Sequence, residues 1–318
     1  MFFRDYKEYI EKNAFGRRKP MSKIIVAGSI NMDIITRVAS LPQTGESIVG
    51  KSVEYLPGGK GLNQAVACAK MGAETILVSR LGNDVFATAL TDFIKQHHID
   101  TSYLKNSTKE SGTAFITVDD EGQNTIVVVA GSNADVGIED ISEVPINKSD
   151  IIICQFEIPL PTVTALFRRA RQTGARTILN PSPIQAIPEE LLKLTDVLII
   201  NETELGFIRG ENLNDDTTVE TIAKVANKAK SHPEQIIIVT LGHHGALVVE
   251  NTAYQIHGHS VQAVDTVGAG DCFAGVIASQ LLLGKCLRDC VTIANKAASV
   301  CVTRKGAAPA MPIANEIF

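Results

Sequence analysis

The feature that most constrains the fold of this chain is a regular alternation of short apolar runs with longer stretches of helical periodicity. The apolar runs are strand-sized and lie at 23–30, 74–82, 150–157, 176–183, 196–204, 235–242 and 246–250. Helices are predicted at 63–73, 85–98, 161–174, 218–232, 271–284 and 287–306. Alternating units with nearly continuous apolar strands are typical of a parallel sheet covered by helices on both faces. We therefore predict a Rossmann-like α/β fold with a mostly parallel sheet.

Two segments, 34–59 and 112–133, break this alternation because they carry few helical signals. In both, apolar and polar residues alternate around turn sequences such as "DDEGQN", a pattern that predicts antiparallel strands. We expect a small antiparallel sheet that projects from the main domain, with lid segments at about 34–57 and 111–131. Such a sheet beside a site can act as a lid, and its exposed apolar face could also pair with a second copy of the chain.

Composition narrows the class of protein. The chain has 318 residues, of which 45% are hydrophobic and 20% charged, as in an ordinary soluble enzyme. A net charge of −5 argues against nucleic acid or an anionic membrane as the main partner, and no apolar run reaches the ~18 residues of a membrane span. The six cysteines form no C-x-x-C pair. They are predicted to be buried free thiols, which indicates a reducing cytoplasm.

The first twenty residues differ from the rest. They contain six Lys or Arg against three Asp or Glu and lack the apolar core of a secretory signal. Met21 is followed at once by the first predicted strand, and we take it as the start of the folded domain. We expect 1–20 to be an extension or a misassigned start, disordered or non-native, rather than a functional arm, and 21–318 to form one domain.

Polar residues follow the predicted core strands where each strand ends. These residues are Asn31 and Asp33, Gln155 and Glu157, Asn180, Asn201 with Glu202 and Glu204, and Thr240 with Gly242. Turns prefer such residues in any case, but ligands of an open parallel sheet bind outside the carboxyl ends of its strands. Five strands ending in this way predict a shared cleft.

The cleft divides into two halves. Asn31, Asp33, Glu157 and the turn at 58–63 come from the N-terminal half, and their carboxylates and amides suit a polyhydroxylated molecule. The polar residues of the later half are Asn201, Glu204, Thr240, Gly242 and Gly245. This second group belongs with the sequence "GAGD" at 268–271, which we expect to bind an anion.

The sequence "AVDTVGAGDCFAG", at 263–275, places a glycine-rich turn directly before a helix. Free N–H groups of such a turn bind anions, so Gly268, Ala269 and Gly270 are predicted to hold a transferring phosphoryl group. Asp271 would then orient the attacking hydroxyl and take its proton late in a loose transition state. From these residues alone, Asp271 could equally be a simple helix cap.

Other nucleotide-binding motifs are absent from the sequence. "PGGKGLN" lacks the spacing of a Walker A loop, and "GSINMD" lacks the glycines of a dinucleotide fingerprint. His243 and His244 are either solvated loop residues or flank a nucleotide. His257 and His259 alternate on a predicted strand without the further ligands that a metal site needs.

Taken together, these motifs resemble those of a known family. They are "GSINMD", "GGKGLNQA", "QFEIP", "NPSP", "NETE", "TLGHHG", "AVDTVGAGDCFAG" and "VTRKGAAPAMP", in family order and with family-like spacing. The chain resembles the ribokinase family of PfkB-type sugar kinases, which also includes fructokinase and adenosine kinase. The resemblance covers essentially Met21 to Pro312.

The resemblance implies a fold, an activity and partners. The fold would be the α/β domain with its β-lid, and dimers would form through the lid. The activity would be ATP-dependent phosphorylation of D-ribose at its 5-hydroxyl. The alternatives are a kinase for deoxyribose, fructose or adenosine, and a non-catalytic sugar or nucleotide sensor on the same fold.

The resemblance also assigns roles to residues. Asp271 would be the catalytic base, and the N–H groups of Gly268, Ala269 and Gly270 would form the anion hole. The sugar ligands would be Asn31, Asp33, Gly58, Gly59, Lys60, Asn63 and Glu157. ATP would be bound by Asn201, Glu204, Thr240, Leu241, Gly242, His243, His244, Gly245, Gly270 and Asn295.

Two metal ions are implied in the same way. Glu204 would help to organise Mg²⁺ through water. K⁺ would activate the enzyme, bound by the Asp265 carboxylate and by the backbone carbonyls of Val267, Cys301, Arg304 and Gly306. Ala310 stands where a serine hydroxyl often reaches this cation in the family, so the resemblance implies that water would take the place of that ligand.

Overall fold

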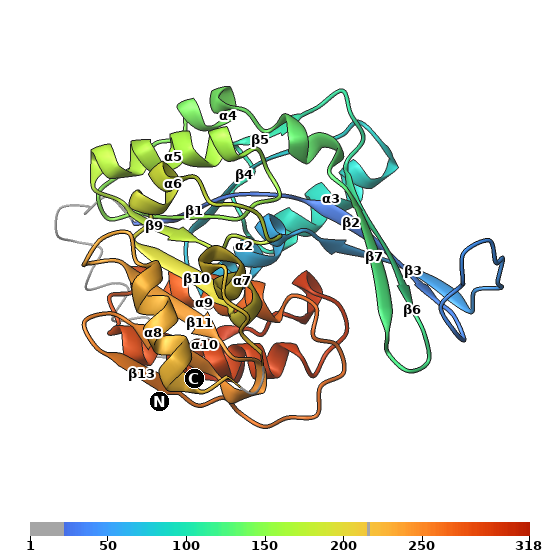
Figure 1. The fold of residues 1–318 in the computed structure, drawn as a ribbon. Helices are drawn as coiled ribbons and strands as arrows, with labels where there is room; N and C mark the ends of the chain where they lie inside the picture. The colour runs from blue at the N-terminus through green and yellow to red at the C-terminus, as the bar shows by residue number, and fades with distance from the viewer. Residues whose placement is uncertain (1–21, 215–216) are drawn as a thin grey trace, which may run out of the picture.

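The computed structural model describes residues 22–214 and 217–318, so the expectation for residues 1–20 lies outside the described part (Figure 1). The main sheet has nine strands in the order β13-β12-β11-β10-β9-β8-β1-β4-β5. The strands are β1 (Ile24–Ala27), β4 (Thr75–Leu81), β5 (Leu104–Asn106), β8 (Ile151–Cys154), β9 (Arg176–Leu179), β10 (Val197–Asn201), β11 (Ile236–Thr240), β12 (Ala246–Val249) and β13 (Ala253–Ile256). The predicted mostly parallel sheet is confirmed.

The register of the sheet brings the five predicted strand ends together. β1 pairs in parallel with β4 and β8, so that Val26 lies opposite both Leu77 and Ile153. β9, β10 and β11 continue in parallel, whereas β12 and β13 return antiparallel. The strands that end in polar residues are therefore consecutive neighbours, and their carboxyl ends meet at one edge.

Helices cover both faces of this sheet. The long helices are α2 (Lys60–Lys70), α3 (Val85–Gln96), α5 (Leu160–Thr173), α8 (Val219–Ala229), α9 (Ala269–Leu282) and α10 (Leu287–Cys301). The short ones are α4 (Ile138–Ser142), α6 (Glu189–Lys193), α7 (Glu202–Arg209) and α11 (Ala314–Ile317), with 3₁₀ turns at Gly131–Asp135, Gly242–His244 and Ala308–Ala310. Apolar side chains of α2, α3, α9 and α10 pack on one face of the sheet, and those of α4 to α8 pack on the other.

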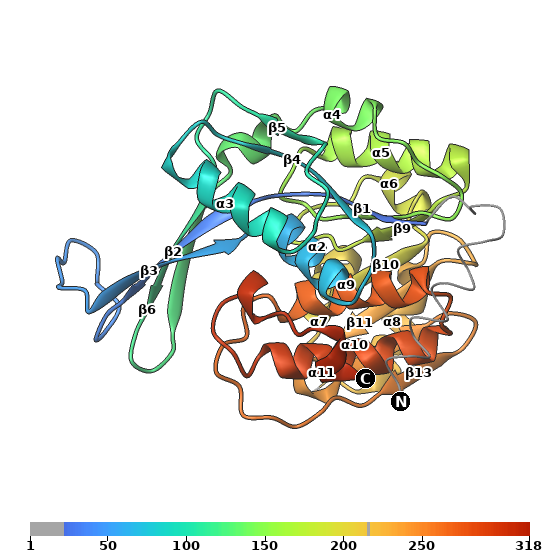
Figure 2. The same cartoon turned by 180° about the vertical axis from the view of Figure 1, so that it is seen from behind.

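The predicted second sheet projects from the side of the main domain (Figures 1 and 2). Its strands are β2 (Asn31–Arg37), β3 (Ser52–Gly58), β6 (Gly112–Val118) and β7 (Asn124–Val129), in the order β3-β2-β6-β7. The hairpins β2–β3 and β6–β7 are antiparallel, and a parallel pairing of β2 with β6 joins them. We call this sheet the lid. β2 follows directly from β1, so the lid grows out of the sheet edge that carries the site.

Local capping moved several predicted boundaries. The strand predicted at 196–204 stops at Asn201, because Asn201 and Glu204 form a capping box that starts α7. The helix predicted from 271 begins at Ala269, which places Asp271 in its first turn. The helix predicted to 306 ends at Cys301. The strand predicted to carry His257 and His259 ends before them, as β13 at Ile256. The sequence analysis did not predict α4, α6, α7, α11 or β5, which are short.

The packing of α2 against α9 depends on a glycine. A Cβ atom on Gly275 of α9 would lie 2.6 Å from the Ala67 Cβ and 2.6 Å from the Gln64 carbonyl oxygen, both on α2. On the other side of α2, a Cβ on Gly61 would lie 2.4 Å from the Gly28 carbonyl carbon, after β1. Only glycine allows α2 to pack this closely between α9 and β1.

All six cysteines are free, and five of them are buried, as predicted; only Cys286 is exposed. Among the described residues, the structure has no helix of the length and apolarity needed to cross a membrane.

Replacement of Gly275 by valine is expected to destabilise the fold. The added side chain must displace α2, and overpacking of this kind costs about 2–3 kcal/mol. Urea denaturation measures the free energy of unfolding. The control is Gly270→Ala on the same helix, because a Cβ at Gly270 meets no atom within 4 Å; it should leave stability within about 0.5 kcal/mol. Equal stability of Gly275→Val and wild type would contradict this account of the contact.

Candidate active site

Asp271 lies at the third position of α9, with only 5% of its surface exposed. Gly268 caps the helix with φ +79, and a Cβ there would lie 2.7 Å from the Ala307 Cβ. Both the left-handed backbone conformation and the lack of space therefore require glycine at this position. The first N–H groups of a helix have no intrahelical partner. Of these, the Ala269 N–H contacts the Thr266 carbonyl at 3.3 Å. The geometry combines a buried carboxylate with a predicted anion-binding turn.

The Asp271 carboxylate accepts one hydrogen bond on each oxygen, both from the first turns of α2. Asn63 Nδ2 donates to Oδ2 over 2.9 Å, and Gln64 Nε2 donates to Oδ1 over 2.9 Å. Two amide donors stabilise the charged form of a carboxylate that is nearly excluded from water. The caps of α9 do not use this side chain, so the alternative of a simple helix cap is not what the structure shows.

Asp33 and Asn31 mark the start of the lid at the sugar half of the predicted cleft. A Cβ at Gly58, on the paired strand β3, would lie 2.1 Å from Asp33 Oδ2, so Gly58 makes room for this carboxylate. Burial, with smaller contributions from Glu157 and Asp271, raises the pKa of Asp33 to about 7. Asn133 donates to Asn31 Oδ1 over 2.8 Å and fixes the orientation of its amide.

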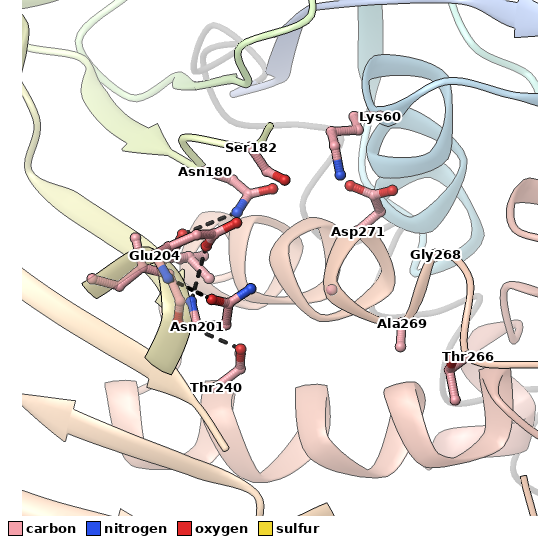
Figure 3. A pocket seen from close by; sticks show the side chains of 13 residues that line it. Lys60, Asn180, Ser182, Asn201, Glu204, Thr240, Thr266, Gly268, Ala269 and Asp271 are labelled. Carbon is pink, nitrogen blue, oxygen red and sulfur yellow. Dashed lines mark hydrogen bonds between the residues drawn. The ribbon is translucent and has the colours of Figure 1, made fainter. Parts of the chain in front are cut away.

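Glu157 and Lys60 contact each other at the start of α2. Glu157 Oε2 accepts hydrogen bonds from the Ser29 hydroxyl at 2.5 Å and from the Lys60 backbone N–H at 3.1 Å. Burial alone would lower the pKa of Lys60, but the carboxylates of Asp271, Glu157 and Glu204 raise it above its ordinary value. Figure 3 shows the Lys60 ammonium pointing toward Asp271. A fixed positive charge thus faces the carboxylates of the site.

Asn201 and Glu204 bind each other at the end of β10. The Asn201 side chain accepts the Glu204 N–H at 2.7 Å, and Glu204 Oε2 accepts the Asn201 N–H at 2.9 Å. Burial raises the pKa of Glu204, although the Asn201 N–H and Lys60 act to lower it. One carboxylate oxygen of Glu204 remains outside the capping box, so this residue can still hold a cation through water.

Two adjoining cavities meet at the start of α9. The central cavity, of about 150 Å³, is lined by Lys60, Asn180, Ser182, Ile199, Ile200, Asn201, Glu204, Thr240, Thr266, Gly268, Ala269, Gly270 and Asp271 (Figure 3). The larger cavity, of about 500 Å³, shares Thr240, Thr266, Ala269 and Gly270 with the first. Its other walls include Phe273, Val302, Ala298 and Val261, with Gly242, His243, Gly245 and Asn295. A volume in this range suits a small-molecule ligand.

A third cavity, of about 380 Å³, opens under the lid and is lined by Asn31 and Glu157 together with Val128 of β7. Asp33, Gly58, Gly59 and Asn63 line none of these three cavities, although Asn63 contacts Asp271, which lines the central one. Asn63 Oδ1 is buried and has no partner among the described residues, so it can accept a hydrogen bond from a ligand. Leu241 is buried and His244 is exposed, and neither lines the large cavity, whereas His243 does.

The predicted K⁺ ligands come from two loops that Asp265 joins. Asp265 Oδ1 accepts the Val267 N–H at 3.0 Å, and Oδ2 accepts the Gly306 N–H at 2.9 Å. The Cys301 carbonyl accepts the Arg304 N–H, and Ala310 is buried in a 3₁₀ turn with no side-chain oxygen. One carboxylate and several carbonyls suit a hard cation. The described residues contain no group of three or more His, Cys, Asp or Glu that could hold a metal ion.

The cation loops also contact the lid. A Cβ at Gly306, which has φ +80, would lie 2.9 Å from Leu56 Cδ1 on β3. The loop that carries Gly306, and through Gly306 the Asp265 carboxylate, is therefore in contact with the strand that pairs with Asp33.

Comparison with known proteins assigns the chain to a family. A family model described as "pfkB family carbohydrate kinase" matches residues 21–314. The chain belongs to the pfkB family of carbohydrate kinases. It is 36% identical over 302 residues to a ribokinase of Staphylococcus aureus, covering 93% of this chain and 98% of that protein. A mouse ribokinase is 35% identical over 81% of each chain. The predicted family is confirmed.

Solved structures of relatives agree with the fold of this carbohydrate kinase. A ribokinase of Arabidopsis thaliana, solved with ribose and ATP, gives a TM-score of 0.82 at 30% identity, covering 93% of this chain and 97% of that one. A ribokinase of Thermotoga maritima gives a TM-score of 0.81 at 33% identity, with 93% and 98% covered. These likenesses extend over the main sheet and the lid alike.

The sequence analysis missed several residues of the site. Gln64 and Asn133 hold predicted site residues in place, and Ser182 and Phe273 line the cavities. The "NQA" and "NPSP" motifs contained Gln64 and Ser182, so a signal for these two was present. Phe273 likewise lay within the "AVDTVGAGDCFAG" motif, whereas Asn133 gave no signal beyond its position.

The raised pKa of Asp33 predicts how stability depends on pH. In the folded protein Asp33 keeps its proton up to a pH of about 7, whereas its ordinary value is 3.8. Wild type should therefore lose stability relative to Asp33→Asn as the pH rises from 4 to 7, by at most about 1.4 kcal/mol per pH unit. Urea denaturation of both proteins at several pH values measures this difference, in which the titrations of groups that do not interact with Asp33 cancel. A difference that stays constant from pH 4 to pH 7 would show that Asp33 is not buried as described.

Proposed function

We propose that this carbohydrate kinase transfers the γ-phosphoryl group of ATP to the 5-hydroxyl of D-ribose. The observation that carries the proposal is the position of Asp271. Its buried, hydrogen-bonded carboxylate lies in the first turn of α9, where the central cavity adjoins the large apolar one. Relatives that match nearly the whole chain at 30% identity or more include ribokinases, and one of these was solved with ribose and ATP.

In this proposal the sugar occupies the space between the lid and α2. Asn31, Asp33, Asn63 and Glu157 present amide and carboxyl oxygens there, and each can bond a vicinal hydroxyl. The backbone at Gly58, Gly59 and Lys60 closes the other side. The unpartnered Asn63 Oδ1 supports this assignment because a buried polar atom without a partner is costly until a ligand fills it.

The adenine and ribose of ATP would occupy the large cavity. Phe273, Ala298 and Val302 offer apolar contact, and Asn295 and Thr240 offer polar groups at its rim. The triphosphate would run along Asn201 and the Gly242–Gly245 turn toward α9. Mg²⁺ would be held through water at Glu204, and K⁺ at Asp265 and the neighbouring carbonyls, where it would support the loop that precedes α9.

Phosphoryl transfer then needs little covalent chemistry from the protein. Asp271 orients the primary hydroxyl and accepts its proton as the new P–O bond forms and the bond to the ADP oxygen breaks. The amides of Gly268, Ala269 and Gly270 bind the transferring group, and the Lys60 ammonium balances its charge. Orientation and charge stabilisation are the main sources of rate in such reactions.

Replacement of Asp271 by asparagine is expected to lower kcat by about 10²- to 10⁴-fold, because the proton acceptor is lost. ATP binding, measured by calorimetry, should stay within about twofold.

A coupled kinase assay on ribose, deoxyribose, fructose and adenosine, with and without K⁺, tests the substrate and the ion together. We expect ribose to be preferred and K⁺ to increase the rate. Wild-type kcat in Asp271→Asn, or activity on adenosine alone, would contradict the proposal.

We also propose that two copies of the chain pair through their lids in the cytoplasm. The lid exposes large apolar side chains, among them Val53 (51%), Tyr55 (55%), Phe115 (49%) and Val127 (62%). Contiguous exposed apolar surface of this kind marks an interaction site. Pairing would cover the lid face and fix the lid above the sugar.

Replacement of Val127 by aspartate is therefore expected to shift the protein from dimer to monomer, since it places a charge within the buried face. Sedimentation velocity measures the change. The control is Ile138→Asp, at a similarly exposed position (54%) at the start of α4, outside the lid. Wild type that sediments as a monomer would refute lid pairing.

A further inference from the structure

Gln64 is a buried side chain that contacts the base of the proposed reaction without reaching the substrate. It lies on α2, has no exposed surface, and lines none of the three cavities of the site. Its Nε2 group donates to Asp271 Oδ1 over 2.9 Å and to Asn180 Oδ1 over 3.1 Å. Its Oε1 atom accepts a hydrogen bond from Gln155 Nε2 at 2.5 Å. Every polar atom of the Gln64 amide is thus engaged.

The neighbours of Gln64 leave its amide only one orientation. Asn180 Nδ2 donates to the Ile199 carbonyl at 3.0 Å, so the Asn180 oxygen must face Gln64. Gln155 presents its NH₂ group to Gln64, but Gln155 Oε1 has no partner among the described residues, so Gln155 follows the orientation of Gln64 and does not determine it. A rotation of the Gln64 amide by 180° would place an NH₂ group against a donor and an oxygen against both Asn180 Oδ1 and the Asp271 carboxylate. Asn180, at the end of β9, therefore orients the Gln64 NH₂ group toward itself and Asp271.

This hydrogen bond determines where a hydroxyl can approach Asp271. A carboxylate has about four lone-pair positions, and α2 occupies one on each oxygen through Asn63 and Gln64. The plane of the carboxylate is thereby fixed, and the remaining positions face the cavity. Asn63 can also bond a sugar, whereas Gln64 can act only through Asp271.

We propose that Gln64 is the positioning residue of the catalytic base: it holds the Asp271 carboxylate in the plane that receives the substrate hydroxyl. The inference rests on the proposed function, because it presupposes that Asp271 accepts the proton of the sugar. Without Gln64, Asp271 Oδ1 can rotate toward the Lys60 ammonium, which points into the same space (Figure 3).

The first test replaces Gln64 by methionine, which keeps the length of the side chain and removes the donor. We expect kcat with ribose to fall by about 10- to 100-fold, as for other misplaced catalytic groups, while KM for ATP stays within about twofold. The matched control is Gln235→Met. Gln235 is also fully buried, and it donates to the Leu192 and Thr195 carbonyls outside the site. Its replacement should lower the melting temperature and leave kcat unchanged.

The second test, Gln64→Glu, measures a pH dependence of kcat that a purely structural role of Gln64 would not produce. While the new carboxyl group keeps its proton, it can still donate to Asp271; once ionised, it repels Asp271. The ratio of variant to wild-type kcat should therefore fall as the pH rises from 6 to 9, and the ratio for Gln64→Met should stay flat. The other groups that face Asp271 are Lys60, Asp33, Glu204 and the thiols of Cys272 and Cys301. They are common to both proteins, and their titration largely cancels in the ratio.

The outcomes separate the two claims. If wild type phosphorylates none of the sugars, the proposed function fails. If wild type is active and Gln64→Met keeps its kcat, the positioning role is refuted while the function stands. The proposal is also overturned if Gln64→Met loses kcat but Gln64→Glu shows no more pH dependence than Gln235→Glu. Gln64 would then contribute only to packing. Should Gln64→Met not fold, the pH ratio of Gln64→Glu decides alone.

Discussion

The contact between the first turns of α2 and α9 is the interaction on which the rest of the site depends. α2 follows the lid hairpin, and α9 follows the glycine-rich turn, so the contact joins the proposed sugar half of the cleft to its proposed nucleotide half. Asn63 and Gln64 on one helix hold Asp271 on the other, and Gly275 lets the two backbones approach closely enough for these bonds to form. A larger residue at 275 would separate the donors from the carboxylate. Packing and chemistry thus depend on the same pair of helices.

The contact also explains how a carboxylate can lie in a site built for anions. The start of α9 favours negative charge, and two amide donors from α2 compensate the loss of water around Asp271. The Lys60 ammonium, whose pKa the surrounding carboxylates raise, supplies positive charge to the same space. In the proposed mechanism, Asp271 and the incoming phosphoryl group would occupy different sides of the helix end, with the Lys60 ammonium beside them. This arrangement would separate the group that accepts a proton from the groups that bind phosphate.

The sequence predicted those parts of the structure that local patterns encode. The apolar runs predicted the parallel sheet, and the polar residues that follow them predicted the edge at which Asn31, Glu157 and Thr240 meet. Features that depend on distant contacts escaped prediction. Gln64 lies 207 positions from Asp271, and nothing in "NQA" says which carboxylate its amide meets. The parallel pairing of β2 with β6 likewise joins segments far apart in the chain. Helix α7 was missed for a local reason, because the apolar run of β10 continues into the capping box of Asn201 and Glu204.

A structure of the protein with ribose and a non-hydrolysable ATP analogue tests the central claim most directly, because it places both reacting groups relative to Asp271. The account predicts the primary hydroxyl of the sugar within about 2.6–3.2 Å of an Asp271 oxygen, on the side away from Gln64. It also predicts the terminal phosphate at the amides of 268–270, in line with that hydroxyl. A sugar bound with this hydroxyl turned away from Asp271, or a triphosphate that ends elsewhere than the start of α9, would contradict it.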